Sequence, residues 1–322
     1  MKKDNEENEK IAIIIDCDPG VDDTAAIALS LYDDFFDLKL ITTVSGNKDI
    51  NIVTRNILHV LELFNRTDIP VAKGSGRALY RISPDASYIH QNTGMGGYNP
   101  PKTVKTQPIK KHAVEAMYEV IKQNAGNICI IALGPQTNIA KLILKHPDVK
   151  SMVNHIYTEG SASYQTTSNP RWTEHKSFNA RTDPEAVDIV INSGIPITYV
   201  PSEMGREGAN FSEEEINYIK SINDVGRFLW KMYSGYWEPG YPDKRIATND
   251  TCAVLAMRFP SLFKTELASF SINTTDKPGK TIITKNPKGN VNFAIAVDKQ
   301  RLHEFYFNAV KKLNRIKIDI KD

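Results

Sequence analysis

The sequence predicts one α/β domain with a mainly parallel, Rossmann-like central sheet flanked by helices, plus a small antiparallel excursion. Short apolar runs alternate with helical patterns through the first part of the chain. This alternation is typical of parallel sheets with helices on both faces. Three strand-like runs then follow one another within 265–298, which indicates the antiparallel part. In a sheet of this kind, ligands bind beyond the carboxyl ends of the strands.

The first element is the apolar run at 11–15, which we interpret as a buried strand. A helix is expected at 22–32, where acidic residues in the first turn favour the helix dipole. The same succession of strand and helix then repeats. Further strands are predicted at 38–46, 69–74, 127–134 and 197–202, and further helices at 49–65, 112–124, 137–146 and 183–193.

The remaining part of the chain is less regular. A polar stretch at 163–177 has no period, and a helical pattern at 224–237 is broken by a Gly/Pro-rich segment. An amphipathic helix at 300–314 closes the chain. We expect residues 1–10 to form a flexible, charged N-terminal arm and residues 11–322 to form the domain. The predicted antiparallel strands are 265–275, 280–285 and 290–298.

Composition excludes several classes of function. The chain has 322 residues, and its 40 basic and 38 acidic residues leave a net charge of +2, which gives no electrostatic argument for nucleic acid or a membrane surface. No apolar run is long enough to span a bilayer, and no signal peptide is expected after the charged N-terminal residues. Only three cysteines are present, which favours a reducing, cytoplasmic location.

Four carboxylates lie within the segment DCDPGVDDT, which directly follows the first strand. Asp22 and Asp23 can be explained as helix-start residues, but Asp16 and Asp18 lie at a strand end, where aspartate is disfavoured. Alternation puts Asp16 and Asp18 on one side, and a turn at Gly20 brings Asp18 and Asp23 towards a common point. Converging carboxylates without Cys or His favour a Ca²⁺ or Mg²⁺ site.

Three known metal-binding or phosphate-binding motifs share some features with this sequence. An EF-hand loop starting at Asp16 needs glutamate at its twelfth position, which is Ile27. A haloacid-dehalogenase-type phosphatase also begins with a strand and Asp-x-Asp, but it needs Thr or Val where Gly20 stands, so that resemblance is weak although it stays open. A P-loop at 278–281 needs a glycine where Thr274 stands.

The segment DCDPGVDDTAAI closely resembles the signature of the inosine–uridine-preferring nucleoside hydrolases, which are calcium-dependent ribonucleoside N-ribohydrolases. The resemblance covers nearly the whole chain, because further segments occur in the order of the family. These segments are TTVSGN (42–47), TRNIL (54–58), IHQNTGMGGY (89–98), ALGPQTNIA (132–140), FNARTDPEA (178–186) and NDTCAV (249–254).

The resemblance implies hydrolysis of the N-glycosidic bond of a ribonucleoside to free base and ribose. It implies that Ca²⁺ is held by Asp18, Asp23, the backbone carbonyl of Leu133 and Asp250, together with two ribose hydroxyls and a water. Asp18 would take the proton from that water, and Asp16 would support the site from behind. It also implies a homodimer or homotetramer with a small-molecule nucleoside as its substrate.

The same resemblance implies a set of substrate-binding residues. Asp22 would bind the 2′-hydroxyl, Asp250 the 3′-hydroxyl and Asn179 the 5′-hydroxyl, while Asn47 would orient the metal ligands. Turn or helix-cap chemistry also accounts for Asn47, Asn179 and Asp250. His90 is a further pocket candidate because it lies inside one of the matching segments. The remaining two candidates are Asn249 and Tyr241, the latter in an aromatic segment expected to cover the base.

Five departures from the family pattern concern the nucleoside. Asn249 stands where purine-active members carry a histidine that assists the leaving base, and Ser177 stands where a glutamate that binds the 5′-hydroxyl is expected. TEG (158–160) and PSE (201–203) replace the expected MGG and GLD. The loop before Ser177 is longer than usual and carries Arg171, His175 and Lys176.

Three alternatives to plain nucleoside hydrolysis stay open. The cations in the long loop and the loss of an acid at Ser177 favour a 5′-substituted or 5′-phosphorylated nucleoside. The loss of a histidine at Asn249 favours a ribose- and Ca²⁺-binding relative with weak turnover. A phosphohydrolase that uses the same acidic cleft is the third alternative.

Overall fold

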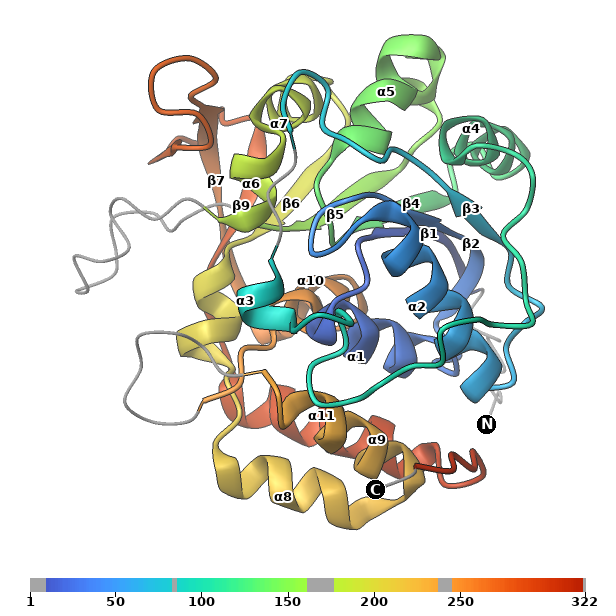
Figure 1. Ribbon diagram of the computed structural model, residues 1–322. Helices are drawn as coiled ribbons and strands as arrows, with labels where there is room; N and C mark the ends of the chain where they lie inside the picture. The colour runs from blue at the N-terminus through green and yellow to red at the C-terminus, as the bar shows by residue number, and fades with distance from the viewer. Residues whose placement is uncertain (1–9, 83–85, 161–176, 237–244, 321–322) are drawn as a thin grey trace, which may run out of the picture.

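The computed structural model describes residues 10–82, 86–160, 177–236 and 245–320. Its strands form one nine-stranded sheet with the order β3-β2-β1-β4-β5-β6-β9-β7-β8 (Figure 1). The strands are β1 (Ile11–Cys17), β2 (Phe36–Thr43), β3 (Val71–Lys73), β4 (Ile128–Ala132), β5 (His155–Glu159), β6 (Ile197–Val200), β7 (Phe263–Ile272), β8 (Thr281–Lys285) and β9 (Val291–Val297).

The strand pairing confirms the predicted fold class. All neighbours from β3 to β9 in the sheet are parallel, and only the β9–β7 and β7–β8 pairs are antiparallel. The antiparallel part does not form a separate unit, because β9 also pairs in parallel with β6 through Thr198 and Asn292. The C-terminal strands therefore extend the main sheet.

Helices cover both faces of this sheet (Figure 1). None of them, in the ranges described, has the length and apolar character that a membrane span requires. The α-helices are α1 (Val21–Ser30), α2 (Ile50–Leu63), α3 (Ser87–His90), α4 (Ala113–Gln123), α5 (Thr137–Lys145), α6 (Phe178–Thr182), α7 (Pro184–Ile191), α8 (Glu213–Ile222), α9 (Asp224–Tyr233), α10 (Asn249–Arg258) and α11 (Lys299–Lys312).

The uninterrupted apolar run of β1 follows from burial on both sides. Ile13 and Ile15 pack in one core layer with α1, α2, α9 and α11. Ala12 and Ile14, which point the other way, pack in the second layer with α4, α5 and α7. A central parallel strand covered on both faces has no solvent side, so alternation of polar and apolar residues is absent. This burial on both sides is the physical reason for the first predicted strand.

Helix α8 is a ten-residue helix that the periodic pattern did not predict. Its first turn has a capping box, in which Glu215 N–H donates to Ser212 Oγ and Ser212 N–H donates to Glu215 Oε2. This signature was present in the sequence, and capping boxes mark helix starts. The adjacent helix predicted at 224–237 ends earlier, at Tyr233. Residues 1–9 of the expected arm lie outside the described part of the chain.

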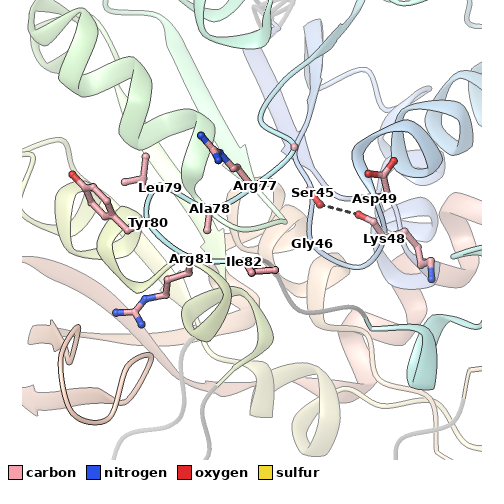
Figure 2. Close-up of a pocket in the computed structure, with 11 residues that line it drawn as sticks. Ser45, Gly46, Lys48, Asp49, Arg77, Ala78, Leu79, Tyr80, Arg81 and Ile82 are labelled. Carbon is pink, nitrogen blue, oxygen red and sulfur yellow. Dashed lines mark hydrogen bonds between the residues drawn. The ribbon is translucent and has the colours of Figure 1, made fainter.

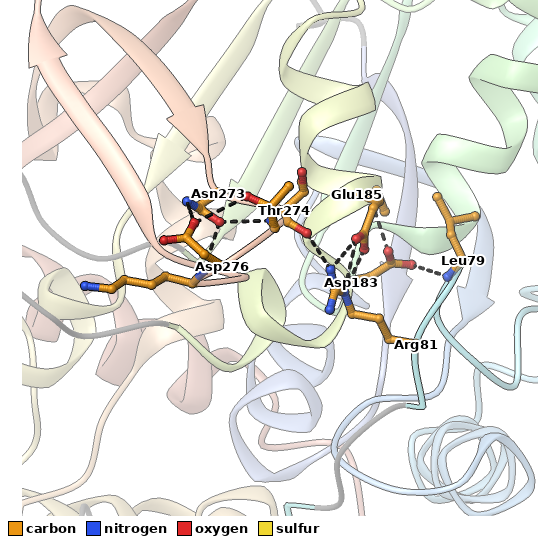
Figure 3. A network of polar contacts seen from close by, with 10 residues as sticks. Leu79, Arg81, Asp183, Glu185, Asn273, Thr274 and Asp276 are labelled. Atoms are coloured by element: carbon orange, nitrogen blue, oxygen red, sulfur yellow. Dashed lines mark hydrogen bonds and ion pairs between the residues drawn. The ribbon is translucent and has the colours of Figure 1, made fainter.

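A polar network ties the segment after β3 to helix α7 and to the β7–β8 connection (Figure 3). Asp183 Oδ2 accepts hydrogen bonds from Leu79 N–H at 2.9 Å and from Thr137 Oγ1 at 2.6 Å, and Oδ1 caps α7 through Ala186 N–H. Arg81 binds Glu185 on α7 and donates to the carbonyl of Thr274 at 2.6 Å. The network therefore fixes the segment after β3 in its position against α7.

We expect Asp183→Ala to lower the free energy of unfolding by about 2 kcal/mol, because it removes a helix cap and leaves buried donors without an acceptor. Urea denaturation followed by circular dichroism measures this change. Asp276→Ala is the control, since Asp276 belongs to the exposed turn in the same region and we expect no measurable change. Equal stability of the Asp183 variant and the wild type would contradict this role.

Candidate active site

The candidate site lies at the carboxyl edge of the sheet, where β1 and β4 are neighbours. The chain leaves β1 towards β2 on one side and later returns with β4 on the other, so the crossovers diverge here. Such a switch point leaves a crevice at the strand ends. Asp18 directly follows β1 and Leu133 directly follows β4, and Leu133 N–H donates to the carbonyl of Asp16 at 2.8 Å. The topology therefore brings the two predicted segments together.

Three carboxylates meet in this crevice. One oxygen each of Asp22, Asp23 and Asp250 lies within 4.8 Å of the others, and all three side chains are buried. Asp22 and Asp23 come from the first turn of α1 and Asp250 from the first turn of α10. Burial, followed by the charge of Asp22, raises the pKa of Asp23 to about 7. Burial and the neighbouring aspartates raise the pKa of Asp250 well above its usual range.

Asp18 lies beside this cluster with one oxygen held and one open. Its Oδ2 accepts a 2.6 Å hydrogen bond from the backbone N–H of Asn47, whereas Oδ1 is buried and has no hydrogen-bond partner. Its own N–H donates to Asp23 Oδ1 at 3.2 Å. Burial, with the charge of Asp23 second, raises the pKa of the Asp18 carboxyl well above its usual range. A Cβ on Gly134 would lie 2.7 Å from Oδ1, so only glycine fits there.

Asn47 connects the two halves of the site. Besides its backbone bond to Asp18, its Nδ2 donates to the carbonyl of Asp18 at 3.1 Å and to Asp23 Oδ2 at 3.0 Å. Asp23 Oδ2 also accepts from Gly20 N–H, at 3.0 Å. These hydrogen bonds fix the loop after β2 against the loop after β1. The Asn47 side chain therefore has a role in the site besides the turn chemistry that the sequence suggested.

The Asp16 side chain points towards α5, on the face of the sheet opposite to α1. Its Oδ1 accepts from Thr42 Oγ1 at 2.5 Å and from Asn138 Nδ2 of α5 at 2.8 Å, while Oδ2 is buried without a partner. Burial raises the pKa of Asp16 to about 7. Asp16 thus links β1, β2 and α5 and does not belong to the group of three clustered carboxylates. Its predicted role behind the site stays a prediction.

A further carboxylate, Glu159, ends β5 and lies in the same pocket as Asp22 and Asp250. Glu159 Oε2 accepts from Asn179 Nδ2 at 3.0 Å, and Oε1 accepts from Ser202 Oγ at 2.6 Å. The same Asn179 amide donates to the carbonyl of Leu133 at 2.6 Å. Burial raises the pKa of Glu159 to about 7, while Ser202 and the positive charge of Arg206 act against this rise.

His90 and Tyr236 line the same pocket and contact the first turn of α1. His90 Nδ1 accepts from Val21 N–H at 3.1 Å, and burial lowers the pKa of His90, so the ring is held in its neutral form. Tyr236 Oη donates to Asp22 Oδ2 at 3.1 Å, and its ring centroid lies 5.3 Å from that of His90. The two rings therefore orient Asp22 and the start of α1.

Asn249 begins α10 at the wall of the pocket. Its Oδ1 is buried without a hydrogen-bond partner and lies against Gly205, where an added Cβ would be 2.5 Å away. A Cβ on Gly205 would lie 2.5 Å from Asn249 N, so the turn Met204–Gly208 packs directly against this residue. Tyr241, and the loop residues Arg171, His175 and Lys176, lie outside the described residues.

A second, larger pocket of about 600 Å³ opens beside the site (Figure 2). Its walls include Gly46 and Lys48, which flank Asn47, and the segment from Arg77 to Ile82. Ser45 Oγ donates to the carbonyl of Lys48 at 3.3 Å in this wall. None of the clustered carboxylates lines it, so we place the chemistry in the smaller pocket.

The chain matches a known protein family over most of its length. The family model described as inosine-uridine preferring nucleoside hydrolase matches residues 13–304. The chain belongs to this family. Its reaction class, hydrolysis of the N-glycosidic bond of a ribonucleoside, follows from that membership. Membership also argues against the phosphohydrolase alternative.

Relatives within this nucleoside hydrolase family cover almost the whole chain. The non-specific ribonucleoside hydrolase RihC of Salmonella paratyphi B is 31% identical over 292 residues, which are 89% of this chain and 93% of that protein. Among solved structures, the plant nucleoside hydrolase PpNRh1 matches with a TM-score of 0.85 at 26% identity, over 94% of this chain and 99% of that one. A purine-preferring ribonucleoside hydrolase from Gardnerella vaginalis matches with a TM-score of 0.84 at 24% identity, over 95% and 100% of the two chains, which shows the shared fold.

The structure of this nucleoside hydrolase gathers most of the predicted site residues. Asp22, Asn47, His90, Leu133, Asn179, Asn249 and Asp250 line one pocket, and Asp18 and Asp23 contact Asn47 at its border. The sequence alone did not assign Glu159, Ser202 or Arg206 to the site, and it placed Tyr236 only in the aromatic segment expected to cover the base. Glu159 and Ser202 belong to TEG and PSE, so the position of both segments at strand ends was the signal available.

Proposed function

We propose that this hydrolase cleaves ribonucleosides to free base and ribose with Ca²⁺ as cofactor and Asp18 as general base. The observation that carries the proposal is the buried group Asp22, Asp23 and Asp250 beside the unpartnered oxygen of Asp18. Burying several carboxylates together is costly unless a cation compensates them. Oxygen ligands without Cys or His match Ca²⁺.

The residues that would hold the ion are Asp18, Asp23, the backbone carbonyl of Leu133 and Asp250. Asp18 Oδ1 supports this choice because it is buried without any other partner. The Leu133 carbonyl accepts one hydrogen bond, from Asn179, and a carbonyl oxygen has a second lone pair to offer. When bound, Ca²⁺ supplies positive charge that neutralises the cluster and acidifies a water molecule.

Asp18 would accept the proton of the attacking water. The Asn47 backbone N–H holds Oδ2, which leaves Oδ1 directed away from that donor and free of other partners. As the water oxygen bonds to C1′ of the ribose, a proton of the water passes to Asp18 and the bond from C1′ to the base nitrogen breaks. The electron pair of that bond leaves with the base, which then takes up a proton from solvent. The sugar develops positive charge as that bond breaks, and the surrounding carboxylates favour it electrostatically.

The ribose hydroxyls would bind to the acidic wall of the pocket, with Asp22 at the 2′-hydroxyl, Asp250 at the 3′-hydroxyl and Asn179 at the 5′ end. Asn249 lines the same pocket. Its amide can hydrogen-bond a ligand but cannot protonate a leaving base, because it has no titratable proton. A histidine-like acid at this position is therefore not part of the mechanism.

Tyr236→Phe is expected to raise KM for a nucleoside about tenfold with a smaller effect on kcat. The substitution removes the hydroxyl that donates to Asp22 Oδ2 and leaves the ring in place against His90. Steady-state kinetics with a ribonucleoside measures the change. Tyr218→Phe, which changes an exposed tyrosine on α8, is the matched control. Unchanged KM in the Tyr236 variant would contradict the orientation of Asp22 by this residue.

A reducing-sugar assay over a panel of purine and pyrimidine ribonucleosides tests the proposed function, with and without a Ca²⁺ chelator. Release of ribose that depends on Ca²⁺ is the expected result. The alternative of a binding relative with weak turnover predicts a flat assay while calorimetry still detects Ca²⁺ and ribose. Cytoplasmic location and assembly as a homodimer or homotetramer belong to the same proposal, and light scattering of the purified protein tests the assembly.

A further inference from the structure

Glu159 is a buried carboxylate that the metal cluster does not use. The residue is 6% exposed and lines the pocket that also contains Asp22 and Asp250. The two side chains that donate to it come from different elements, since Asn179 belongs to α6 and Ser202 follows β6. Two segments that are distant from Glu159 in the sequence therefore fix its position.

The donors around Glu159 leave it able to accept further hydrogen bonds. Asn179 donates an amide N–H to Oε2 and Ser202 donates its hydroxyl to Oε1. An ionised carboxylate has about four acceptor positions, and these two bonds use half of them. At this end of the pocket, the Glu159 carboxylate can therefore accept a hydrogen bond from a ligand. A neutral hydroxyl group can donate that hydrogen bond.

Glu159 also accounts for two departures from the family pattern together. The family glutamate expected at position 177 is absent here, and the serine at that position caps α6 through Ala180 N–H instead. Gly160, the residue after Glu159, packs against the same region, since a Cβ there would lie 3.3 Å from Ser177 Oγ and 3.6 Å from Asn179 Cβ. Strand β5 supplies a carboxylate next to the place where α6 lacks one.

We propose that Glu159 binds the 5′-hydroxyl of the ribose and makes the pocket selective for nucleosides over nucleoside 5′-phosphates. The assignment to the 5′ end rests on the proposed function, in which Asn179, the partner of Glu159, takes that end of the sugar. A 5′-hydroxyl donates to the carboxylate. A 5′-phosphate has no donor at this position and brings negative charge against Glu159 and the neighbouring Asp22.

This inference opposes the expectation of a 5′-phosphorylated substrate, which depended on the missing acid at Ser177 and on cations in the preceding loop. An acid is present, but it comes from the end of β5 and not from the start of α6. Arg206 also lies in the pocket, and its positive charge acts on Glu159, so the pair brings no excess of positive charge for a phosphate. The site as a whole stays acidic.

The test compares inosine, 5′-deoxyinosine and inosine 5′-monophosphate as substrates of the wild-type protein, Glu159→Ala and Glu159→Gln, with Ca²⁺ present. We expect the wild type to prefer inosine to 5′-deoxyinosine by about 100-fold in kcat/KM, and Glu159→Ala to reduce this preference at least tenfold. Glu159→Gln, which keeps the shape, should improve kcat/KM for the monophosphate relative to inosine about tenfold. Thermal melting of each variant establishes that it is folded.

Calorimetry provides a second readout that does not need turnover, namely the affinity for D-ribose relative to 5-deoxyribose in each protein. Glu266→Gln is the matched control, because Glu266 lies on β7 and pairs with Lys285, away from the pocket. Equal kcat/KM values of the wild type for inosine and 5′-deoxyinosine would overturn the inference. An undiminished preference of Glu159→Ala for inosine over 5′-deoxyinosine would also overturn it. Absence of turnover together with a Glu159-dependent preference for ribose would overturn the proposed function alone.

Discussion

Asp18→Asn is expected to lower kcat for a ribonucleoside by about 10³-fold to 10⁴-fold, with a much smaller change in KM. The variant keeps the size of the side chain and an oxygen for the cation, but it has no carboxylate to take a proton from water. General bases contribute about 10²-fold to 10⁴-fold, and the loss of one metal-ligand charge adds to that effect. Steady-state reducing-sugar kinetics at saturating Ca²⁺ measures the change.

Asp34→Asn is the control for this substitution, because the Asp34 side chain is 99% exposed and pairs only with Lys10 among the contacts of the described residues. Calorimetric titration with Ca²⁺ separates the loss of a base from the loss of a ligand. We expect Asp18→Asn to bind Ca²⁺ more weakly and to stay slow even when saturated. Activity within tenfold of the wild type at saturating Ca²⁺ would contradict the role of Asp18 as the base.

Removal of Ca²⁺ is expected to lower the melting temperature of the wild type by several degrees. The buried aspartates repel one another when nothing compensates them, as the raised pKa values of Asp18 and Asp250 indicate, with burial as their largest cause. A ligand at 100 times its Kd stabilises the folded state by about 2.7 kcal/mol. Differential scanning fluorimetry with chelator and with added Ca²⁺ measures the difference.

Asp250→Asn should weaken the dependence of the melting temperature on Ca²⁺. In chelator we expect the variant to melt at a higher temperature than the wild type, because one of the clustered negative charges is gone. Added Ca²⁺ should then stabilise it far less, and its activity should be low. Asp34→Asn should respond to Ca²⁺ as the wild type does. A wild-type melting temperature that does not depend on Ca²⁺ would contradict the proposed metal site.

Local sequence was sufficient for much of the fold. The apolar runs that became β1 and β4 are central strands buried on both faces, and burial of that kind leaves its pattern within a few residues. The aspartates of α1 were equally visible, because a strand end, a turn and a helix start follow directly along the chain. The addition of β9 to the main sheet was not visible, since pairing with β6 depends on segments distant in sequence.

The departures at TEG and PSE were visible in the sequence, but their relation was not. Glu159 and Ser202 are 43 residues apart, and only the parallel pairing of β5 with β6 brings their strand ends side by side. Tyr236 is separated from Asp22 by 214 residues, and no local pattern relates an aromatic residue after α9 to the first turn of α1. Contacts of this kind depend on the path of the chain through the whole sheet.

By itself, the sequence determined that this is an α/β nucleoside hydrolase with an acidic segment at the end of its first strand, because hydrophobic periodicity and a contiguous motif are local properties. Only the tertiary structure decided which carboxylates share a pocket, that Asp16 points to the other layer, and that β5 supplies Glu159 beside Asn179. The physical reason is that side-chain convergence depends on strand order and register, which bring together residues that the chain itself keeps far apart.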